Sequence, residues 1–143
     1  MIFIVGGNSQ GKREFARGIL GCESESGWTD GAQAGWADFM KGCRCFNFHL
    51  FIRRLMDREP SLGKPGAAYR PGNEAQFEED VIRALMAGNP NRILVTDEVG
   101  YGIVPIDPLE RCYREETGRI CCLAAKEAEQ VWRVCCGLGQ RIK

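Results

Sequence analysis

Residues 2–16 read IFIVGGNSQGKREFA and place a short apolar run directly before two glycines. Gly6, four intervening residues, Gly11 and Lys12 follow the spacing of a loop that wraps phosphate groups. The apolar residues 2–5 predict a buried β-strand, and residues 11–20 predict a helix with Phe15 and Ile19 one turn apart. Because strand, loop and helix occur in the order that such a loop needs, phosphate binding is favoured over a glycine turn that binds nothing.

The motif predicts that one continuous run of residues binds a nucleotide. Backbone N–H groups at a helix N-terminus attract phosphate, and a lysine there reaches the terminal phosphates as a point charge and acts in catalysis. The residues of this run are Gly6, Gly7, Asn8, Ser9, Gln10, Gly11, Lys12 and Arg13.

Arg13 is the departure from the usual pattern, because a Ser or Thr hydroxyl that ligates Mg²⁺ normally follows the lysine. Two alternatives follow. Arg13 turns outward and the metal is held by other groups and water, or Arg13 itself supplies positive charge and turnover is weak or lost.

The bulk composition narrows the class of protein. The chain has 143 residues, enough for one domain with its own core, and a formal net charge of zero, which gives no bulk attraction to nucleic acid or an anionic membrane. No apolar run approaches the ~20 residues of a membrane-spanning helix, and the N-terminus lacks signal-peptide features, so a cytoplasmic location is expected. The eight cysteines are expected to be mostly small buried apolar residues rather than disulfides or metal ligands.

Strands and helices alternate along the rest of the chain. Helices are predicted over 45–56, 74–87 and 109–130, and strands over 92–96 and 131–136. Residues 22–41 show no clear pattern, and residues 59–73, with three prolines and three glycines, predict a flexible loop. The alternation predicts an α/β fold with a mostly parallel sheet flanked by helices. Since three strands make a narrow sheet, a further short strand near 43–48 or an oligomer is expected.

Two acids follow the second predicted strand directly. Asp97 and Glu98 come directly after the run 92–96, which places them at the carboxyl edge of the sheet, the edge that also carries the phosphate loop. A carboxylate there holds Mg²⁺ or takes the proton of an attacking hydroxyl. We therefore predict that Asp97 and Glu98 are catalytic and that Asp97 binds metal. The alternative is an acid that only caps the turn.

The C-terminal third carries motifs of a known family. The segments VTDEVGYGIVP, YRE, TGR, LAAKEAEQVW and RIK, together with the loop GGNSQGK, resemble the adenosylcobinamide kinase / adenosylcobinamide-phosphate guanylyltransferase family of cobalamin biosynthesis. The resemblance covers about residues 1–20 and 92–143. It implies a recombinase-like P-loop NTPase fold, a single nucleotide-binding domain over 1–143 and a homo-oligomer.

The resemblance also implies two reactions. A nucleoside triphosphate, GTP or ATP with Mg²⁺, phosphorylates the aminopropanol hydroxyl of an adenosylcobinamide-type corrinoid, and GTP then transfers GMP to that phosphate through a histidine-linked GMP. His49 is the only histidine of the chain and hence the only candidate carrier. The alternative is a structural role, which is the more common one for a lone histidine on an apolar helix.

This chain is shorter than family members, so the sequence does not decide whether the protein carries out the guanylyl step or the kinase step. The alternative function is a non-catalytic nucleotide-binding regulatory or assembly protein derived from the family.

Overall fold

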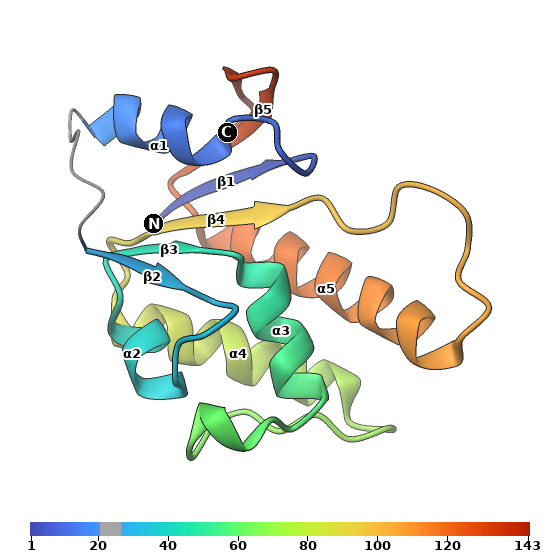
Figure 1. The fold of residues 1–143 in the computed structure, drawn as a ribbon. Coiled ribbons are helices and arrows are strands. Elements are labelled where there is room, and N and C mark those ends of the chain that lie inside the picture. Colours follow the sequence, from blue (N-terminus) through green and yellow to red (C-terminus); the bar gives the residue numbers. More distant parts are fainter. Residues whose placement is uncertain (21–26) are drawn as a thin grey trace.

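The computed structural model describes residues 1–20 and 27–143 (Figure 1). Its strands are β1 (Ile2–Gly6), β2 (Trp28–Asp30), β3 (Arg44–Phe46), β4 (Ile93–Asp97), β5 (Gln130–Cys135) and β6 (Leu138–Arg141). Its helices are α1 (Lys12–Leu20), α2 (Trp36–Lys41), α3 (Phe48–Met56), α4 (Glu74–Gly88), α5 (Pro108–Glu127) and the short 3₁₀ helix η1 (Pro60–Leu62).

One six-stranded sheet, in the order β2-β3-β4-β1-β5-β6, forms the centre of the molecule. The first five strands run parallel, and β6 is antiparallel to β5 because a tight turn joins them. β1 lies between β4 and β5, and Gly6 at its end is in register with Asp97 at the end of β4. The predicted mostly parallel α/β fold is confirmed, and the phosphate loop leaves the sheet beside Asp97.

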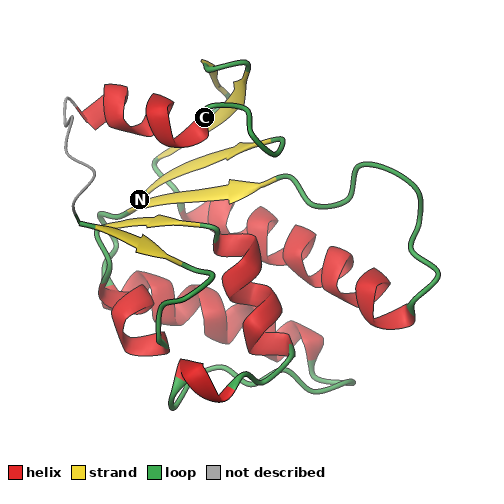
Figure 2. Ribbon diagram, in the orientation of Figure 1, coloured by secondary structure: helices red, strands yellow, loops and turns green. Residues whose placement is uncertain are grey.

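Helices cover both faces of the sheet (Figures 1 and 2). α1 packs on one face, over a small core that contains Ile4 and Val95. α2, α3, α4 and α5 lie on the opposite face, over a larger core that contains Phe3 and Leu94. Neighbouring residues of a strand therefore serve opposite cores, as the pleat requires.

Most predicted elements are present. The strands predicted at 2–5 and 92–96 and the helices predicted at 11–20 and 74–87 are confirmed to within a residue or two. The further strand predicted near 43–48 is β3.

Two helix boundaries in the prediction were wrong. The helix predicted from residue 45 begins at Phe48, because residues 44–46 form β3, which pairs with β2 and β4, and Asn47 takes a left-handed conformation at φ 55°. The helix predicted to reach residue 130 ends at Glu127, since Ala128 is extended at ψ 142° and Gln130 already pairs with β1.

Three elements besides η1 were not predicted. β2 and α2 lie in the stretch 22–41 that showed no pattern, of which residues 22–26 fall outside the described part of the chain. β6 lies in the C-terminal tail. The predicted loop at 59–73 is irregular apart from η1, and Leu62, Ala67 and Tyr69 from it are buried in the larger core. Its flexibility stays a prediction.

The expectation of mostly buried cysteines was wrong for the described residues. Of their seven cysteines only Cys45 is buried, whereas Cys43, Cys122, Cys135 and Cys136 are exposed. Cys43 lies directly before β3, Cys122 lies on α5, and Cys135 and Cys136 lie at the end of β5 and in the turn that follows it. No helix in the described part of the chain combines the length and the apolarity that crossing a membrane requires.

Candidate functional site

The loop between β1 and α1 is held against the sheet by close backbone contacts. A Cβ at Gly6 would overlap the carbonyl oxygen of Val134 in β5, so this position accepts only glycine. Gly11 has φ 77°, a left-handed conformation that glycine adopts without strain. The Gly11 carbonyl accepts the Phe15 N–H at 3.0 Å and so starts α1. The loop N–H groups therefore sit at a helix N-terminus, a position that favours anions.

Gln10 ties this loop to the turn between β5 and β6. The Cys136 N–H donates to Gln10 Oε1 at 2.7 Å, and the Gly137 N–H donates to the Gln10 carbonyl at 2.9 Å. Cys136 and Gly137 both have positive φ, 51° and 77°, which turns their N–H groups toward the loop. The far end of the phosphate loop is thus fixed by a hairpin more than 120 residues away in sequence.

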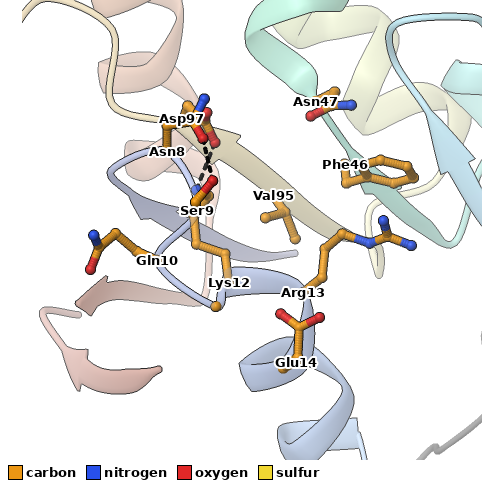
Figure 3. A pocket seen from close by; sticks show the side chains of 11 residues that line it. Asn8, Ser9, Gln10, Lys12, Arg13, Glu14, Phe46, Asn47, Val95 and Asp97 are labelled. Carbon is orange, nitrogen blue, oxygen red and sulfur yellow. Dashed lines mark hydrogen bonds and ion pairs between the residues drawn. The ribbon is translucent and has the colours of Figure 1, made fainter. Parts of the chain in front are cut away.

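Lys12 and Asp97 form an ion pair at the carboxyl edge of the sheet (Figure 3). Lys12 Nζ lies 2.6 Å from Asp97 Oδ1 and donates to the Gly7 carbonyl at 2.6 Å. Lys12 is 7% exposed and Asp97 is half-buried, so solvent screens the pair only in part. The two groups that sequence analysis placed at one edge do meet there.

His49, in the first turn of α3, lies behind this pair. The Asp97 backbone N–H donates to His49 Nδ1 at 3.3 Å, and His49 Nε2 lies 3.9 Å from Asp97 Oδ2. Burial and the nearby Lys12 charge lower the pKa of His49, against an opposing effect of Asp97. A neutral imidazole that accepts at Nδ1 carries its proton on Nε2, the nitrogen facing the Asp97 carboxylate.

Arg13 turns away from the Lys12–Asp97 pair. Its guanidinium carbon lies 4.2 Å from the centre of the Phe46 ring at the end of β3 (Figure 3). This is the spacing of a cation–π contact. The Arg13 side chain therefore points toward β3 and does not fill the position that a metal-ligating hydroxyl would take.

Glu98 lies on the other side of the loop from this pair. Its carboxylate accepts two hydrogen bonds from Arg133 of β5, at 3.0 and 3.3 Å, and its N–H donates to the Gly6 carbonyl at 3.0 Å. Tyr101 Oη lies 3.4 Å from Arg133. Asp97 and Glu98 are adjacent in sequence but face different partners, so they do not form a pair of acids.

Two hollows flank the phosphate loop. The β3 groove, about 210 Å³, lies between the loop and β3 and is lined by residues including Lys12, Arg13, Phe46, Asn47 and Asp97. The hairpin groove, about 930 Å³, lies between the loop and the β5–β6 hairpin and is lined by residues including Gln10, Glu98, Tyr101, Arg133 and Leu138. Asn8 and Gln10 line both, whereas Ser9 lines only the β3 groove and bonds Asn8 Oδ1 at 2.6 Å.

Several residues of these grooves were missed from sequence. Asn47 precedes α3 and donates to Asp30 Oδ1 at 2.8 Å, and its residue type before a helix is a recognisable cap signal. Phe46 and Arg133 gave no signal, because only the strand order β3-β4-β1-β5 brings them to the loop.

Comparison with known proteins gives both a family and relatives. A family model described as cobinamide kinase / cobinamide phosphate guanyltransferase matches residues 50–142. The protein is 47% identical over 51 residues to the bifunctional adenosylcobalamin biosynthesis protein CobU of Salmonella typhimurium (strain LT2), a match over 36% of this chain and 28% of that relative. It is 47% identical over 65 residues to the protein of the same name from Escherichia coli (strain K12), over 46% of this chain and 36% of the relative.

The matched regions span about a third of the length of these relatives. The phosphate loop and His49 precede the range of the family match, so the match does not cover them. The match itself covers α3 from its third residue through β6, including Asp97 at the edge of the sheet. Because that range is more than half of the chain, the protein belongs to the cobinamide kinase / cobinamide phosphate guanyltransferase family.

Proposed function

We propose that this protein phosphorylates the aminopropanol hydroxyl of an adenosylcobinamide-type corrinoid with a nucleoside triphosphate. The observation that carries the proposal is the 2.6 Å pair of Lys12 and Asp97, formed where a glycine loop and a neighbouring parallel strand end together. Membership of the family supports the choice of substrate.

Lys12 would exchange partners when the nucleotide binds. Its ammonium is now neutralised by Asp97 and the Gly7 carbonyl. The triphosphate, held by loop N–H groups and the start of α1, offers oxygens of higher charge to the same ammonium. Nucleotide binding would therefore free the Asp97 carboxylate at the moment when the reacting groups are present.

Asp97 is the residue we assign to the acceptor. A freed carboxylate there takes the proton of the attacking hydroxyl, as a general base. Mg²⁺ fits the same place, because it is commonly held by one carboxylate, phosphate oxygens and water, and bound there it would neutralise charge on the phosphates. Arg13, over Phe46, leaves that position clear.

His49 has two candidate roles, of which the geometry favours positioning. Its Nδ1 accepts from the Asp97 N–H and its Nε2 faces Asp97 Oδ2, so the imidazole orients the carboxylate without a free lone pair. A neutral histidine also leaves the Asp97 charge intact. The carrier role in guanylyl transfer needs Nε2 or Nδ1 to be released, and it stays a prediction.

The kinase assay gives the protein adenosylcobinamide, MgCl₂ and either GTP or ATP, and detects phosphorylated corrinoid by mass spectrometry. We expect product with wild type and none with Lys12→Ala. Absence of product from wild type, with GTP binding measured in the same buffer, would remove the kinase proposal.

Guanylyl transfer is tested separately. Incubation with labelled GTP would give acid-labile, base-stable label on wild type and none on His49→Ala if His49 is the carrier. Label that persists in the variant excludes that role.

A second candidate function is nucleotide binding without catalysis, in a regulatory or assembly protein. Arg13 favours it, because the metal-ligating hydroxyl is absent. Tight GTP binding without product distinguishes it from the kinase. In either case we propose a cytoplasmic protein that assembles as a homo-oligomer.

A further inference from the structure

We propose that Cys135 and Cys136 form a reversible disulfide with each other when they meet a small-molecule disulfide, and that this modification loosens the phosphate loop. Both side chains are exposed, and their Sγ atoms lie 3.9 Å apart, at the end of β5 and in the turn that follows it. The proposed reaction uses neither thiol. The effect on the loop rests on the proposed function, because the loop is where we place the triphosphate.

The backbone of this turn is unusual for a cysteine. Cys136 and Gly137 are the two central residues between β5 and β6, since Cys135 pairs with Leu138. Both have positive φ, 51° and 77°, which is the pattern of a type I′ hairpin turn. Such turns favour Asn, Asp or Gly at the first central position, because these residues tolerate a left-handed backbone. The cysteine at this position instead places its thiol beside that of Cys135.

A second pair of adjacent cysteines shows that adjacency alone is not enough. Cys121 and Cys122 lie within α5, where successive side chains point about 100° apart around the helix axis. Cys121 is also half-buried against the larger core, which restricts the access of a reagent. Cys135 and Cys136 are exposed and lie outside a helix, so they have neither obstacle.

The reaction is a thiol–disulfide exchange in two steps. One thiol of the pair loses its proton, and its sulfur attacks a sulfur of the small-molecule disulfide, whose S–S bond breaks and releases one small thiolate. The second protein thiol loses its proton and attacks the protein sulfur of this mixed disulfide, which releases the second small thiolate. The two protons pass to the released thiolates. The cysteine pair is thereby oxidised by two electrons, and the small disulfide is reduced to two thiols.

The bridge strains the same peptide group that ties the turn to the phosphate loop. Consecutive Cα atoms are ~3.8 Å apart across a trans peptide, below the ~4.4–6.8 Å that is usual for disulfides. Bringing the two sulfurs from 3.9 Å to a bonded distance of ~2.0 Å therefore deforms the peptide between Cys135 and Cys136. That peptide supplies the Cys136 N–H, which donates to Gln10 Oε1 at 2.7 Å.

Oxidation would thus disturb the contact that fixes the far end of the phosphate loop. The Gly137 N–H of the same turn donates to the Gln10 carbonyl at 2.9 Å, so both bonds to Gln10 depend on the geometry of the turn. A loop released from the hairpin must be ordered again when phosphate binds, which lowers affinity. A strained, exposed disulfide is also easily reduced, so the thiols return once the surrounding thiols are reduced.

The modification site is tested by mass spectrometry. We would incubate the protein with glutathione disulfide, block the remaining thiols with iodoacetamide in urea, and digest with trypsin without a reductant. The hairpin peptide, residues 134–141, contains Cys135 and Cys136, and the helix peptide, residues 120–126, contains Cys121 and Cys122 as the internal control.

We expect the hairpin peptide to lose the mass of two hydrogens and to escape alkylation, and dithiothreitol added before the blocking step to reverse both changes. The helix peptide should show no loss of two hydrogens. A hairpin peptide that is fully alkylated, or that keeps glutathione attached, would overturn the proposed bridge.

The effect on the loop is tested by calorimetry with inorganic tripolyphosphate, after the oxidant has been removed by gel filtration. We expect oxidation of the wild type to weaken binding by about tenfold, the effect of losing the two hydrogen bonds to Gln10, and dithiothreitol to restore it. Gln10→Ala lacks the side chain that accepts from the Cys136 N–H, so the difference between its two redox states should be smaller.

Two serine variants separate the bridge from other effects of the oxidant. Cys135→Ser takes up glutathione at Cys136 but cannot close the bridge, so its affinity after oxidation should stay that of the reduced wild type. Cys122→Ser is the matched control, also at an exposed cysteine, and should keep the full wild-type response. A loss of affinity as large in Cys135→Ser as in the wild type would contradict the proposal.

The outcomes also separate the proposal from the function on which its effect rests. If the bridge forms but the affinity for tripolyphosphate is unchanged, the effect on the loop is excluded and the proposed function stands. If the reduced wild type binds tripolyphosphate no better than Lys12→Ala does, the loop is not a phosphate site, and the proposed function fails together with the effect on the loop. The mass of the hairpin peptide decides in either case whether the pair is a modification site.

Discussion

The Asp97 carboxylate faces Lys12 and His49, and in the proposed reaction it also meets the acceptor hydroxyl. Lys12 holds Oδ1, His49 faces Oδ2, and in the proposed reaction the acceptor hydroxyl replaces the lysine. The assignment of Asp97 rather than Glu98 to the acceptor follows from their partners, since Glu98 is already bound twice by Arg133.

Asp97→Asn is expected to lose turnover while retaining nucleotide binding. The amide keeps the shape but accepts no proton, so we expect kcat to fall by about 100-fold or more. Lys12, released from its ion pair, stays available to phosphate, so Kd for GTP should stay or improve. Product by mass spectrometry and Kd by calorimetry give the two numbers. Glu98→Gln is the matched control, and a loss of kcat as large as that of Asp97→Asn would reverse the assignment.

Glu116 illustrates a buried acid outside the site. Its side chain is almost fully buried between α4 and α5, Oε2 has no hydrogen-bond partner, and burial together with the nearby Glu78 raises its pKa to about 7. Because the folded state binds this proton more tightly than the unfolded state does, stability is lost as pH rises from about 4.5 through about 7.

Glu116→Gln should therefore stabilise the protein more at pH 8 than at pH 5. We expect the free energy of unfolding to rise by at least about 1 kcal/mol at the higher pH, with a smaller gain at the lower one. Urea unfolding at both pH values measures the difference. Glu115→Gln, on the same helix but exposed, is the control and should show no such trend. An equal gain from Glu116→Gln at both pH values would show that Glu116 does not titrate in this range.

At the scale of the elements, the contact between α1 and the β5–β6 hairpin holds the phosphate loop in place. Phe15 of α1 lies against Trp132 with ring centres 5.3 Å apart, and it covers Gly139 of β6 so closely that a Cβ there would overlap the Phe15 ring. Gln10 completes the contact from the loop.

Gly139→Ala is expected to destabilise the protein by about 1–3 kcal/mol, because the methyl group must displace the Phe15 ring from a filled space. The control is Gly118→Ala, in α5, where an added Cβ meets no atom within 4 Å. There we expect a gain of about 0.5–1 kcal/mol, the difference in helix propensity. Thermal or urea unfolding of both variants measures these effects. A neutral Gly139→Ala would mean that α1 and the hairpin are not packed in solution as described.

Sequence patterns predicted the central elements and failed at the edges for a physical reason. β1 and β4 are buried on both faces, so their apolar runs are unmistakable. β2 has three half-buried residues, and β6 exposes three of its four, so neither carries a periodic signal.

The residues of the candidate site also separate into those that the sequence predicted and those that it did not. Lys12 and Asp97 were predictable because Lys12 follows the loop after β1, Asp97 ends β4, and these parallel strands end at one edge of the sheet. The partners of Gln10 and the contact of Arg13 with Phe46 were not predictable, because they depend on how β3 and β6 flank the centre.

At the scale of the whole molecule, the loop between β4 and α5 presents an apolar surface. Ile103 and Ile106 are each 96% exposed, and Tyr101 and Val104 of the loop and Leu109 at the start of α5 are also exposed. The loop extends away from the body of the protein (Figure 1). A monomer rarely leaves so many adjacent apolar side chains in water, whereas a second copy of the chain would cover them.

The double variant Ile103→Ser/Ile106→Ser is therefore expected to convert an oligomer of the wild-type chain to a monomer. The changes are at exposed positions, so the fold should be unaffected and the circular dichroism spectrum unchanged. Light scattering after size exclusion gives the mass of each. Ile142→Ser removes an exposed apolar side chain outside the loop and should leave the assembly intact. A monomeric wild type, or a double variant that keeps its mass, would show that this loop does not join copies of the chain. Its apolar surface would then be left for the corrinoid, whose large ring must approach the molecule close to Asp97 if its hydroxyl is to react there.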